Sequence, residues 1–241
     1  MQARLPLWVF GFILAACGSS SSTDTGGAAG TAGASGAGGG AGTAGAAGSA
    51  GTAGAGPLAG MLHVDGEDLV DDQGQKVVLH GVSFGNQVWS NVAVPTLDHT
   101  EADFQRVADM GMNAVRFYMN YVTFEDDAAP YVYKQAGWDW IDQNIAWAKA
   151  QGIRLVLNMH VPQGGFQSNG DGGALWDVVA NQDRLVALWS AIAGRYAAEP
   201  TIAGYGLVNE PVTTVDRAQW KTLASRLVTA IREVDPHHVL F

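Results

Sequence analysis

From residue 61 onward the chain alternates between apolar runs typical of buried strands and segments with apolar positions at helical spacing. Five apolar runs predict strands, at residues 77–84, 113–118, 153–159, 202–208 and 239–241. Between them, apolar positions three and four residues apart predict helices around residues 100–110, 138–151, 185–196 and 220–231. Asp98 or Thr100 is the expected N-cap of the first helix, and Gly111 follows its end. This order of strand and helix predicts parallel βα units.

Two architectures can be built from such units, a (β/α)₈ barrel and a doubly wound sheet. The nucleotide-binding form of the second needs a G-x-G-x-x-G segment directly after a strand, and none of the predicted strands is followed by one. We therefore expect an α/β fold of the (β/α)₈ TIM-barrel type. Such a barrel typically takes about 250 residues, so we expect this one to be truncated after about the fifth strand. Short apolar segments at 62–64, 69–70 and 76–79 predict a small β-hairpin before it.

The first 60 residues have a different composition. Residues 1–17, with Arg4 before a short apolar run that ends in Ala-Ala-Cys17, resemble a lipoprotein-type signal peptide. Residues 18–60, rich in Gly, Ala, Ser and Thr, predict a disordered linker, and residues 61–241 form the partial barrel domain. We expect Cys17 to carry a lipid that anchors an exported protein to a membrane, as a cell-surface or outer-membrane lipoprotein. An ordinary signal peptide, and so a secreted protein, is the alternative.

Charge and cysteine content exclude several classes of function. The formal net charge of −10 argues against nucleic-acid binding, which needs clustered Lys and Arg. Cys17 is the single cysteine, so neither an internal disulfide nor a cysteine-ligated zinc site is possible. His237 and His238 are adjacent, and neighbouring strand residues point to opposite faces, so they make poor joint metal ligands. We expect neither a metal nor an organic cofactor.

Polar residues follow or interrupt three of the predicted strands. Arg116 lies among apolar residues of the second strand, His160 follows the third, and Asn209 and Glu210 follow the fourth. In parallel barrels the carboxyl ends of the strands form one rim, where active sites lie. Each residue alone has a structural explanation, such as an ion pair for Arg116 or a satisfied core position for His160. Together they predict a site at this rim.

These residues, with Gly81-Val82-Ser83-Phe84 and the segment from Gly111 to Arg116, resemble glycoside hydrolase family 5, the cellulase family of retaining enzymes. The resemblance implies that Glu210 is the general acid/base and that Asn209 binds the 2-hydroxyl of the sugar. It implies that Arg116 and His160 support the nucleophile and the sugar, and that Glu210 is kept protonated by burial and a like-charged neighbour. In this family the nucleophilic glutamate ends the seventh strand, which these residues do not include.

Tryptophans in predicted loops are candidates for sugar stacking. Trp89 and Trp176 lie in such loops, and we expect both to bind substrate. The glycine-rich segment at 162–176 also carries amide and hydroxyl groups suited to a polysaccharide or oligosaccharide. Four tryptophans on predicted helices are expected to pack between helices and barrel: Trp138, Trp147, Trp189 and Trp220.

The resemblance implies a retaining β-glycosidase, and among its activities we expect an endo-β-1,4-glucanase. A β-mannanase, an exo-β-1,3-glucanase or a glycosylceramide-cleaving enzyme would share the same motifs. Glu125, Asp171 and Asp177 lie in loops that can reach the rim, but none stands at a nucleophile position. We therefore expect residues 1–241 alone to be inactive, and a non-catalytic surface carbohydrate-binding protein stays open. An unrelated barrel with a phosphate site is a third interpretation.

Overall fold

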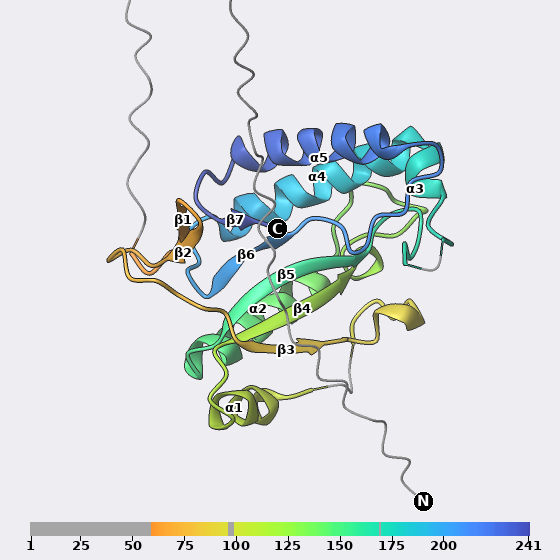
Figure 1. Cartoon of the computed structure of the whole chain (residues 1–241). Helices are drawn as coiled ribbons and strands as arrows, with labels where there is room; N and C mark the ends of the chain where they lie inside the picture. The colour runs from red at the N-terminus through yellow and green to blue at the C-terminus, as the bar shows by residue number, and fades with distance from the viewer. Residues whose placement is uncertain (1–58, 96–98, 169) are drawn as a thin grey trace, which may run out of the picture. The chain divides into compact units, whose positions relative to one another are not determined.

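A computed structural model describes residues 59–95, 99–168 and 170–241 of the chain (Figure 1). The predicted signal peptide, the lipidation residue Cys17, nearly all of the linker and the alternative N-cap Asp98 lie outside the described residues. The partial barrel domain lies almost wholly within them.

The centre of the described chain is a five-stranded parallel sheet in the order β3-β4-β5-β6-β7 (Figure 1). Its strands are the following: β3 (Gly81–Phe84), β4 (Ala114–Asn120), β5 (Arg154–Val161), β6 (Ile202–Gly206) and β7 (Val239–Leu240). Spatial order equals sequence order, as each βα unit of a barrel requires. The predicted fold class is therefore confirmed as part of a (β/α) barrel.

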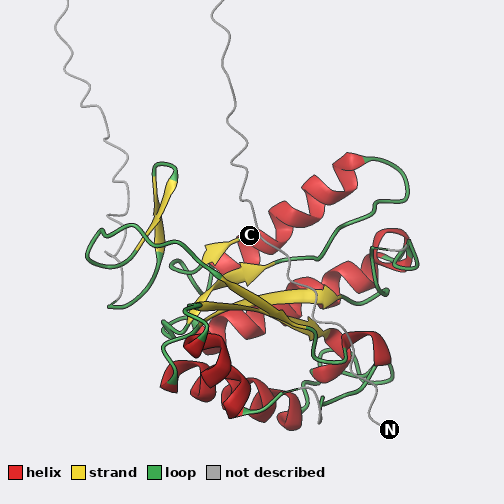
Figure 2. Cartoon of the chain, turned by 60° about the horizontal axis from the view of Figure 1, so that its bottom comes forward, coloured by secondary structure: helices red, strands yellow, loops and turns green. Residues whose placement is uncertain are grey.

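Helices and short helical turns connect the strands (Figure 2). They are the following: η1 (Val88–Ser90), α1 (Glu101–Asp109), η2 (Tyr121–Thr123), α2 (Gln135–Ala150), α3 (Ala174–Asp177), α4 (Val179–Tyr196) and α5 (Arg217–Arg232). Thr100 caps α1, and its side chain and that of Asp103 bind each other's backbone N–H groups in a capping box. All four predicted helices are confirmed. In the described part of the chain, no helix combines the length and the apolar character needed to cross a membrane.

The first sheet strand is shorter than predicted. The sequence predicts residues 77–84, but β3 begins at Gly81. The preceding residues pair elsewhere: Val77 N–H donates to the carbonyl oxygen of Leu69 at 2.7 Å, and Lys76 forms a bridge with Val70. Both partners belong to the predicted hairpin, which is confirmed as antiparallel strands β1 (His63–Asp65) and β2 (Asp68–Val70). The apolar pattern alone does not distinguish these two partners.

Alternate residues of the central strands face the helices. Val115, Phe117 and Met119 of β4 are fully buried. Phe117 packs against Trp140 of α2 with ring centroids 5.0 Å apart. The residues between them, Arg116 and Tyr118, face the opposite side of the sheet, as the period of two in a strand requires. One face of β4 thus builds the core and the other carries polar groups.

The helix tryptophans pack as predicted. Trp189 of α4 is fully buried and Trp138 of α2 nearly so, while Trp147 and Trp220 are partly buried against the same core. Trp189 also donates its indole N–H to the carbonyl oxygen of Leu207 at 3.0 Å. That hydrogen bond ties α4 to the segment just after β6, which carries Asn209 and Glu210.

Candidate active site

The carboxyl ends of β3 to β6 lie together at one end of the sheet (Figure 1). Tyr118 of β4 is level with Asn158 of β5, and Asn158 is level with Gly206, the last residue of β6. A Cβ atom at Gly206 would lie only 2.7 Å from Oδ1 of Asn158, so glycine leaves the space that this amide fills. The register therefore places polar side chains of neighbouring strands within hydrogen-bond reach.

Arg116 is the centre of the polar group. Its Nη2 donates to Oδ1 of Asn158 at 2.8 Å and to Oδ1 of Asn209 at 2.7 Å, while its Nη1 donates to the hydroxyl of Tyr118 at 3.1 Å. The guanidinium carbon lies 4.9 Å from the centre of the Tyr118 ring. A single half-buried guanidinium thus joins β4, β5 and the segment after β6, which Lys, with one ammonium, would do less well.

His160 is buried beside this group. Its ring stacks on Tyr118 at 3.8 Å between centroids, and its Nδ1 lies 3.2 Å from Nδ2 of Asn158. Burial lowers the pKa of His160, and the positive charge of Arg116 lowers it further, to about 3. Both effects disfavour the charged imidazolium, so His160 is neutral at neutral pH.

Asn209 and Glu210 follow β6 in different environments. Asn209 is buried, its backbone N–H donates to the carbonyl oxygen of Met159 at 2.9 Å, and its Nδ2 donates to Oγ of Ser168 at 3.2 Å. Glu210 is exposed and adopts φ = 41°, in the left-handed region that non-glycine residues rarely occupy. Such backbone strain is often found at functional sites.

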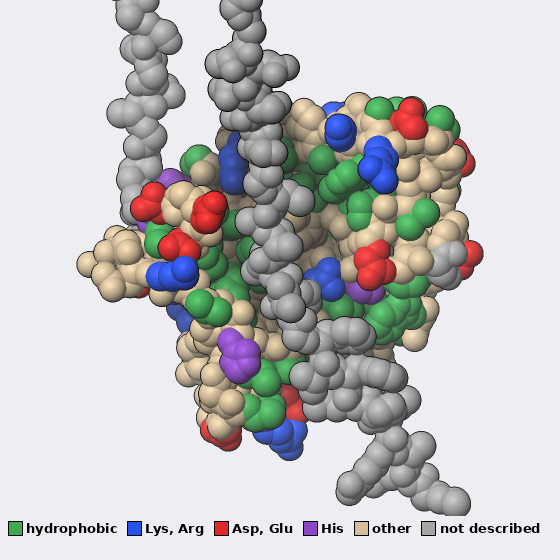
Figure 3. Space-filling model, viewed as in Figure 1, with side chains coloured by type: hydrophobic (Ala, Val, Ile, Leu, Met, Phe, Trp, Pro, Cys, Tyr) green, Lys and Arg blue, Asp and Glu red, His purple; other side chains and the backbone are tan. Residues whose placement is uncertain are grey.

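The expected burial of Glu210 is therefore not found in this structure. β6 ends at Gly206, and the segment after it turns Glu210 outward while Asn209 stays buried. Figure 3 shows basic, acidic and histidine side chains next to one another on the surface to the right of the centre of the view. The carboxyl end of the sheet thus combines a buried polar group with an exposed carboxyl group.

Trp89 lies in η1, directly after β3, and 58% of its surface is exposed. Its ring meets His160 edge-on at 5.3 Å between centroids, and Phe166 at 6.2 Å. Asn120 of β4 fixes the position of η1, because its Nδ2 donates to the carbonyl oxygen of Val88 at 2.7 Å. The structure therefore places Trp89 beside the polar group with an accessible ring, as the sequence predicts.

Trp176 is placed differently from the prediction. It lies in α3, only 4% exposed, and its indole N–H donates to Oε1 of Gln167 at 2.8 Å. The side-chain amide of Gln167 donates in turn to the carbonyl oxygens of Gly165 and Gly172. Trp176 therefore stabilises the loop after β5 from inside, and its expected role as a stacking surface for sugar is wrong.

Two acidic residues near this end of the sheet are engaged by other groups. Glu125 is fully buried, and its Oε1 accepts from Nε of Arg184 and from Nε2 of Gln163, both at 2.8 Å. Asp177 accepts a hydrogen bond from the hydroxyl of Thr214 at 2.6 Å. None of these hydrogen bonds involves Glu210.

The adjacent histidines lie in different environments. His238 is buried, with Nδ1 2.6 Å from Oδ2 of Asp235, whereas His237 is only half-buried. Within residues 59–95, 99–168 and 170–241 there is no group of three or more His, Cys, Asp or Glu side chains arranged to hold a metal ion.

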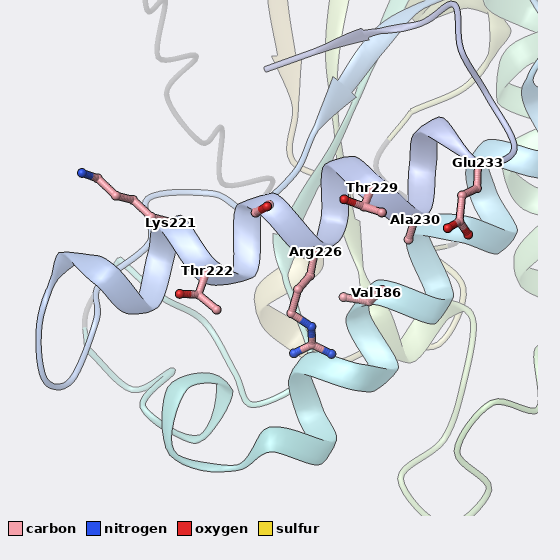
Figure 4. A pocket seen from close by; sticks show the side chains of 8 residues that line it. Val186, Lys221, Thr222, Arg226, Thr229, Ala230 and Glu233 are labelled. Atoms are coloured by element: carbon pink, nitrogen blue, oxygen red, sulfur yellow. The ribbon is translucent and has the colours of Figure 1, made fainter. Parts of the chain in front are cut away.

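A hollow of about 660 Å³ lies elsewhere, along α5 and the adjoining α4 (Figure 4). Its lining residues include Val186 of α4, Arg226 of α5 and Glu233, the residue directly after α5. Arg226 is paired there with Asp183 of α4. None of the site residues at the strand ends lines this hollow, so it takes no part in the candidate site.

Three site residues are not among those predicted: Asn158, Tyr118 and Phe166. Asn158 and Tyr118 each stand two positions from a predicted site residue on the same strand, so the strand period places them on the same face. An amide inside the apolar run Leu155–Met159 was a usable signal for Asn158. Phe166, whose ring lies 5.5 Å from that of His160, has no comparable signal, because its position depends on the loop conformation.

Known proteins provide an independent comparison. Residues 70–241 match the family model described as Cellulase (glycosyl hydrolase family 5). The chain is 31% identical over 220 residues to a β-xylosidase of Phanerodontia chrysosporium, which covers 75% of this chain and 45% of that protein. It is 32% identical over 142 residues to endoglucanase C of Acetivibrio thermocellus, covering 59% of this chain and 41% of the relative.

Solved structures support the fold. A crystal structure of an endogalactoceramidase superimposes with a TM-score of 0.63 at 23% identity, covering 75% of this chain and 52% of the other. At 23% sequence identity, this similarity is evidence for a shared fold and not for a shared activity. The chain spans less than half the length of the two curated relatives above and about half of this structure.

Proposed function

The chain belongs to the cellulase family, glycosyl hydrolase family 5, and from this premise we propose that it carries the acid/base half of a retaining β-glycosidase site. The observation that carries the proposal is the group Arg116–Asn209 at the strand ends, joined by a 2.7 Å hydrogen bond, with Glu210 exposed in the next position. Arg116, His160, Asn209 and Glu210 are the residues on which the resemblance to this family depends.

In a retaining glycosidase one carboxyl group attacks the anomeric carbon and the other first protonates the leaving oxygen and then activates water. We assign the second role to Glu210. Its exposure and its strained backbone support this, because the side chain projects from a fixed segment to where a substrate can reach it. The oxygen of Asn209 accepts from Arg116 and one of its amide N–H groups donates to Ser168, which leaves the second amide N–H as a donor for a sugar hydroxyl.

Among substrates we propose a β-1,4-linked glucan cleaved within the chain. The similarity to endoglucanase C and the exposed ring of Trp89 support a sugar polymer laid along the strand ends. The β-xylosidase and the endogalactoceramidase among the similar proteins keep other substrates open. A β-mannanase, an exo-β-1,3-glucanase and a glycosylceramide-cleaving enzyme are the alternatives that substrate comparison must separate.

We propose that the nucleophilic carboxylate is supplied by a part of the protein beyond these 241 residues. Two observations support this. Glu125 and Asp177 are engaged by Arg184 and Thr214, and the curated relatives are more than twice as long as the matched region. A non-catalytic surface carbohydrate-binding protein is the second candidate, favoured by the same engagement of Glu125 and Asp177 with other groups.

The test compares hydrolysis of cellotetraose, mannotetraose and laminaritetraose by the protein translated from the complete reading frame. We expect cellotetraose to be cleaved at an internal bond and Glu210→Gln to reduce this rate by about 10²–10⁴-fold, the range for removing a general acid. The same variant should still release dinitrophenol from 2,4-dinitrophenyl β-cellobioside, because that leaving group needs no proton. The 241-residue chain alone should turn over none of them.

Glu233→Gln is the matched control, since Glu233 is exposed directly after α5, among the residues that line the separate hollow. It should leave every rate unchanged. If Glu210→Gln hydrolyses cellotetraose at the unaltered rate, the acid/base assignment is wrong. If the complete protein binds cellotetraose without cleaving any substrate, the binding protein is the correct alternative.

The proposed location is the cell surface. The sequence before residue 61 supports acylation of Cys17 and a spacer, residues 18–60, between membrane and domain. Partition of the expressed protein into a detergent phase, lost in Cys17→Ala, is the expected result. An unacylated protein found in the medium would instead indicate an ordinary secretory signal.

A further inference from the structure

Arg116 determines which way the side-chain amide of Asn158 points. A guanidinium has only donors, so the Asn158 atom 2.8 Å from its Nη2 must be the oxygen. The other end of the amide is then the N–H₂ group. Asn158 is buried, and Gly206 leaves the space for it, so the amide has little freedom to turn.

The N–H₂ group of Asn158 in turn determines the state of His160. It lies 3.2 Å from Nδ1 of the imidazole and can only donate. Nδ1 must therefore accept, and a neutral imidazole whose Nδ1 accepts carries its proton on Nε2. A protonated Nδ1 would place two donors against each other. The low pKa of His160, about 3, agrees with this arrangement, because burial and Arg116 both oppose a second proton.

We infer that Asn158 is a positioning residue that holds His160 in the Nε2–H tautomer, so that the site presents a fixed N–H donor rather than an acceptor. Among the residues that the structure describes, none is hydrogen-bonded to Nε2 of His160. Asn209 is oriented in the same way, since its oxygen accepts from the same Arg116 nitrogen and its amide N–H₂ group points away.

One guanidinium thus aligns two amides and, through Asn158, one imidazole. A site with donors fixed in this way is matched to acceptor oxygens, which the hydroxyl and ring oxygens of a sugar supply. The choice of sugar oxygen as the acceptor rests on the proposed function, but the tautomer does not. It can be measured on the 241-residue chain without any ligand.

The experiment is nitrogen-15 NMR of the histidine rings in the 241-residue chain between pH 4.5 and 8. We expect His160 to show a protonated Nε2 and an unprotonated Nδ1 across this range. Asn158→Asp replaces the donor by a carboxylate oxygen, so His160 should gain a proton on Nδ1 and its pKa should rise by roughly 1–3 units. Asn158→Leu removes the hydrogen bond without adding charge and should give a mixture of the two neutral tautomers.

Asn113→Asp is the matched control. Its amide also has both ends bonded, to the N–H of His80 and the carbonyl oxygen of Val78, but before β4 at the other end of the sheet. This variant should leave the His160 signals unchanged. Circular dichroism of each variant confirms the fold, and if Asn158→Asp does not fold, Asn158→Leu gives the comparison.

A proton on Nδ1 of His160 in the unaltered chain would overturn the inference, as would variants at Asn158 that fold and leave the tautomer unchanged. A second arm measures cellotetraose affinity by calorimetry, where loss of one neutral hydrogen bond should weaken binding roughly 2- to 10-fold in Asn158→Leu. The affinity is measured on the protein translated from the complete reading frame, and if the 241-residue chain shows the expected tautomer while the complete protein does not bind cellotetraose, the inference holds and the proposed substrate is wrong.

Discussion

Arg116 of β4 donates a 2.7 Å hydrogen bond to the side-chain oxygen of Asn209, 93 residues further along the chain and just beyond β6. The same nitrogen bonds Asn158 of the intervening strand β5. Three consecutive βα units are therefore joined at their carboxyl ends by one side chain. The position of Glu210, the residue after Asn209, depends on this bond as well as on the strand that precedes it.

Arg116→Lys should weaken both stability and binding. An ammonium cannot reach Asn158, Asn209 and Tyr118 together, and the buried amide oxygen of Asn158 would lose its charged donor. We expect the free energy of unfolding to fall by about 1–3 kcal/mol, measured by urea denaturation. Arg226→Lys, which alters a partly exposed ion pair with Asp183, should change it by less than about 0.5 kcal/mol. Equal effects of the two variants would contradict the central role of Arg116.

Trp89 and Trp176 should respond to substitution in opposite ways. Trp89→Ala removes an exposed ring, so affinity for cellotetraose should fall roughly 2- to 10-fold with little change in stability. Trp176→Ala leaves a cavity and removes the hydrogen bond to the side-chain oxygen of Gln167. The free energy of unfolding should therefore fall by about 3–5 kcal/mol. Calorimetric titration and urea denaturation of both variants provide the comparison. Unchanged affinity in Trp89→Ala would exclude this ring as the stacking surface.

Glu125→Gln should strongly destabilise the loops after β4 and β5. It leaves the charge of Arg184 in a buried position where the exposed Asp127 is the remaining acidic partner among the described residues, and breaking a buried pair typically costs about 3–5 kcal/mol. Lys149→Met, which removes the pair between exposed Lys149 and partly buried Glu199, should cost less than about 1 kcal/mol. Urea denaturation measures both. Similar small losses in the two variants would show that the buried pair contributes little.

Protonation of Asp235 should lower the free energy of unfolding at acidic pH. Burial alone would raise its pKa, but the hydrogen bond and charge of His238 and the backbone N–H groups of His237 and His238 outweigh burial and lower the pKa to about 2. A lowered carboxyl pKa stabilises the fold above the unfolded value of 3.8, and this contribution is lost as the pH falls toward 2. The difference between the unfolded and folded pKa of Asp235 corresponds to a contribution of about 2 kcal/mol to the free energy of unfolding.

The measurement is urea denaturation of the unaltered chain and of Asp235→Asn between pH 6 and pH 2. The groups around Asp235 are His238, the hydroxyl of Tyr205 at 2.8 Å and Arg232, which donates to the carbonyl oxygen of Asp235. The difference between the two proteins should be largest near pH 6 and shrink toward pH 2. A difference independent of pH would show that the carboxylate charge is not responsible.

Local pattern was sufficient for most elements of this fold. Apolar residues at a period of two predict the strands, and those at a period of three to four predict the helices. Thr100 and Gly111 mark the ends of α1. The polar residues Arg116, His160 and Asn209 stood out for the same reason, because each interrupts or ends an apolar run. Burial of a polar group is costly, so such positions point to a site even without a structure.

Sequence by itself therefore determined the order of βα units, the family and the residues that meet at the carboxyl ends of the strands. Only the tertiary structure decided that Trp176 packs inward, that Glu210 projects outward, and that Asn158 links Arg116 to His160. The physical reason is that a hydrogen bond between residues 42 or 93 positions apart depends on strand register and loop conformation. Those are properties of the packed sheet, and no local period along the chain encodes them.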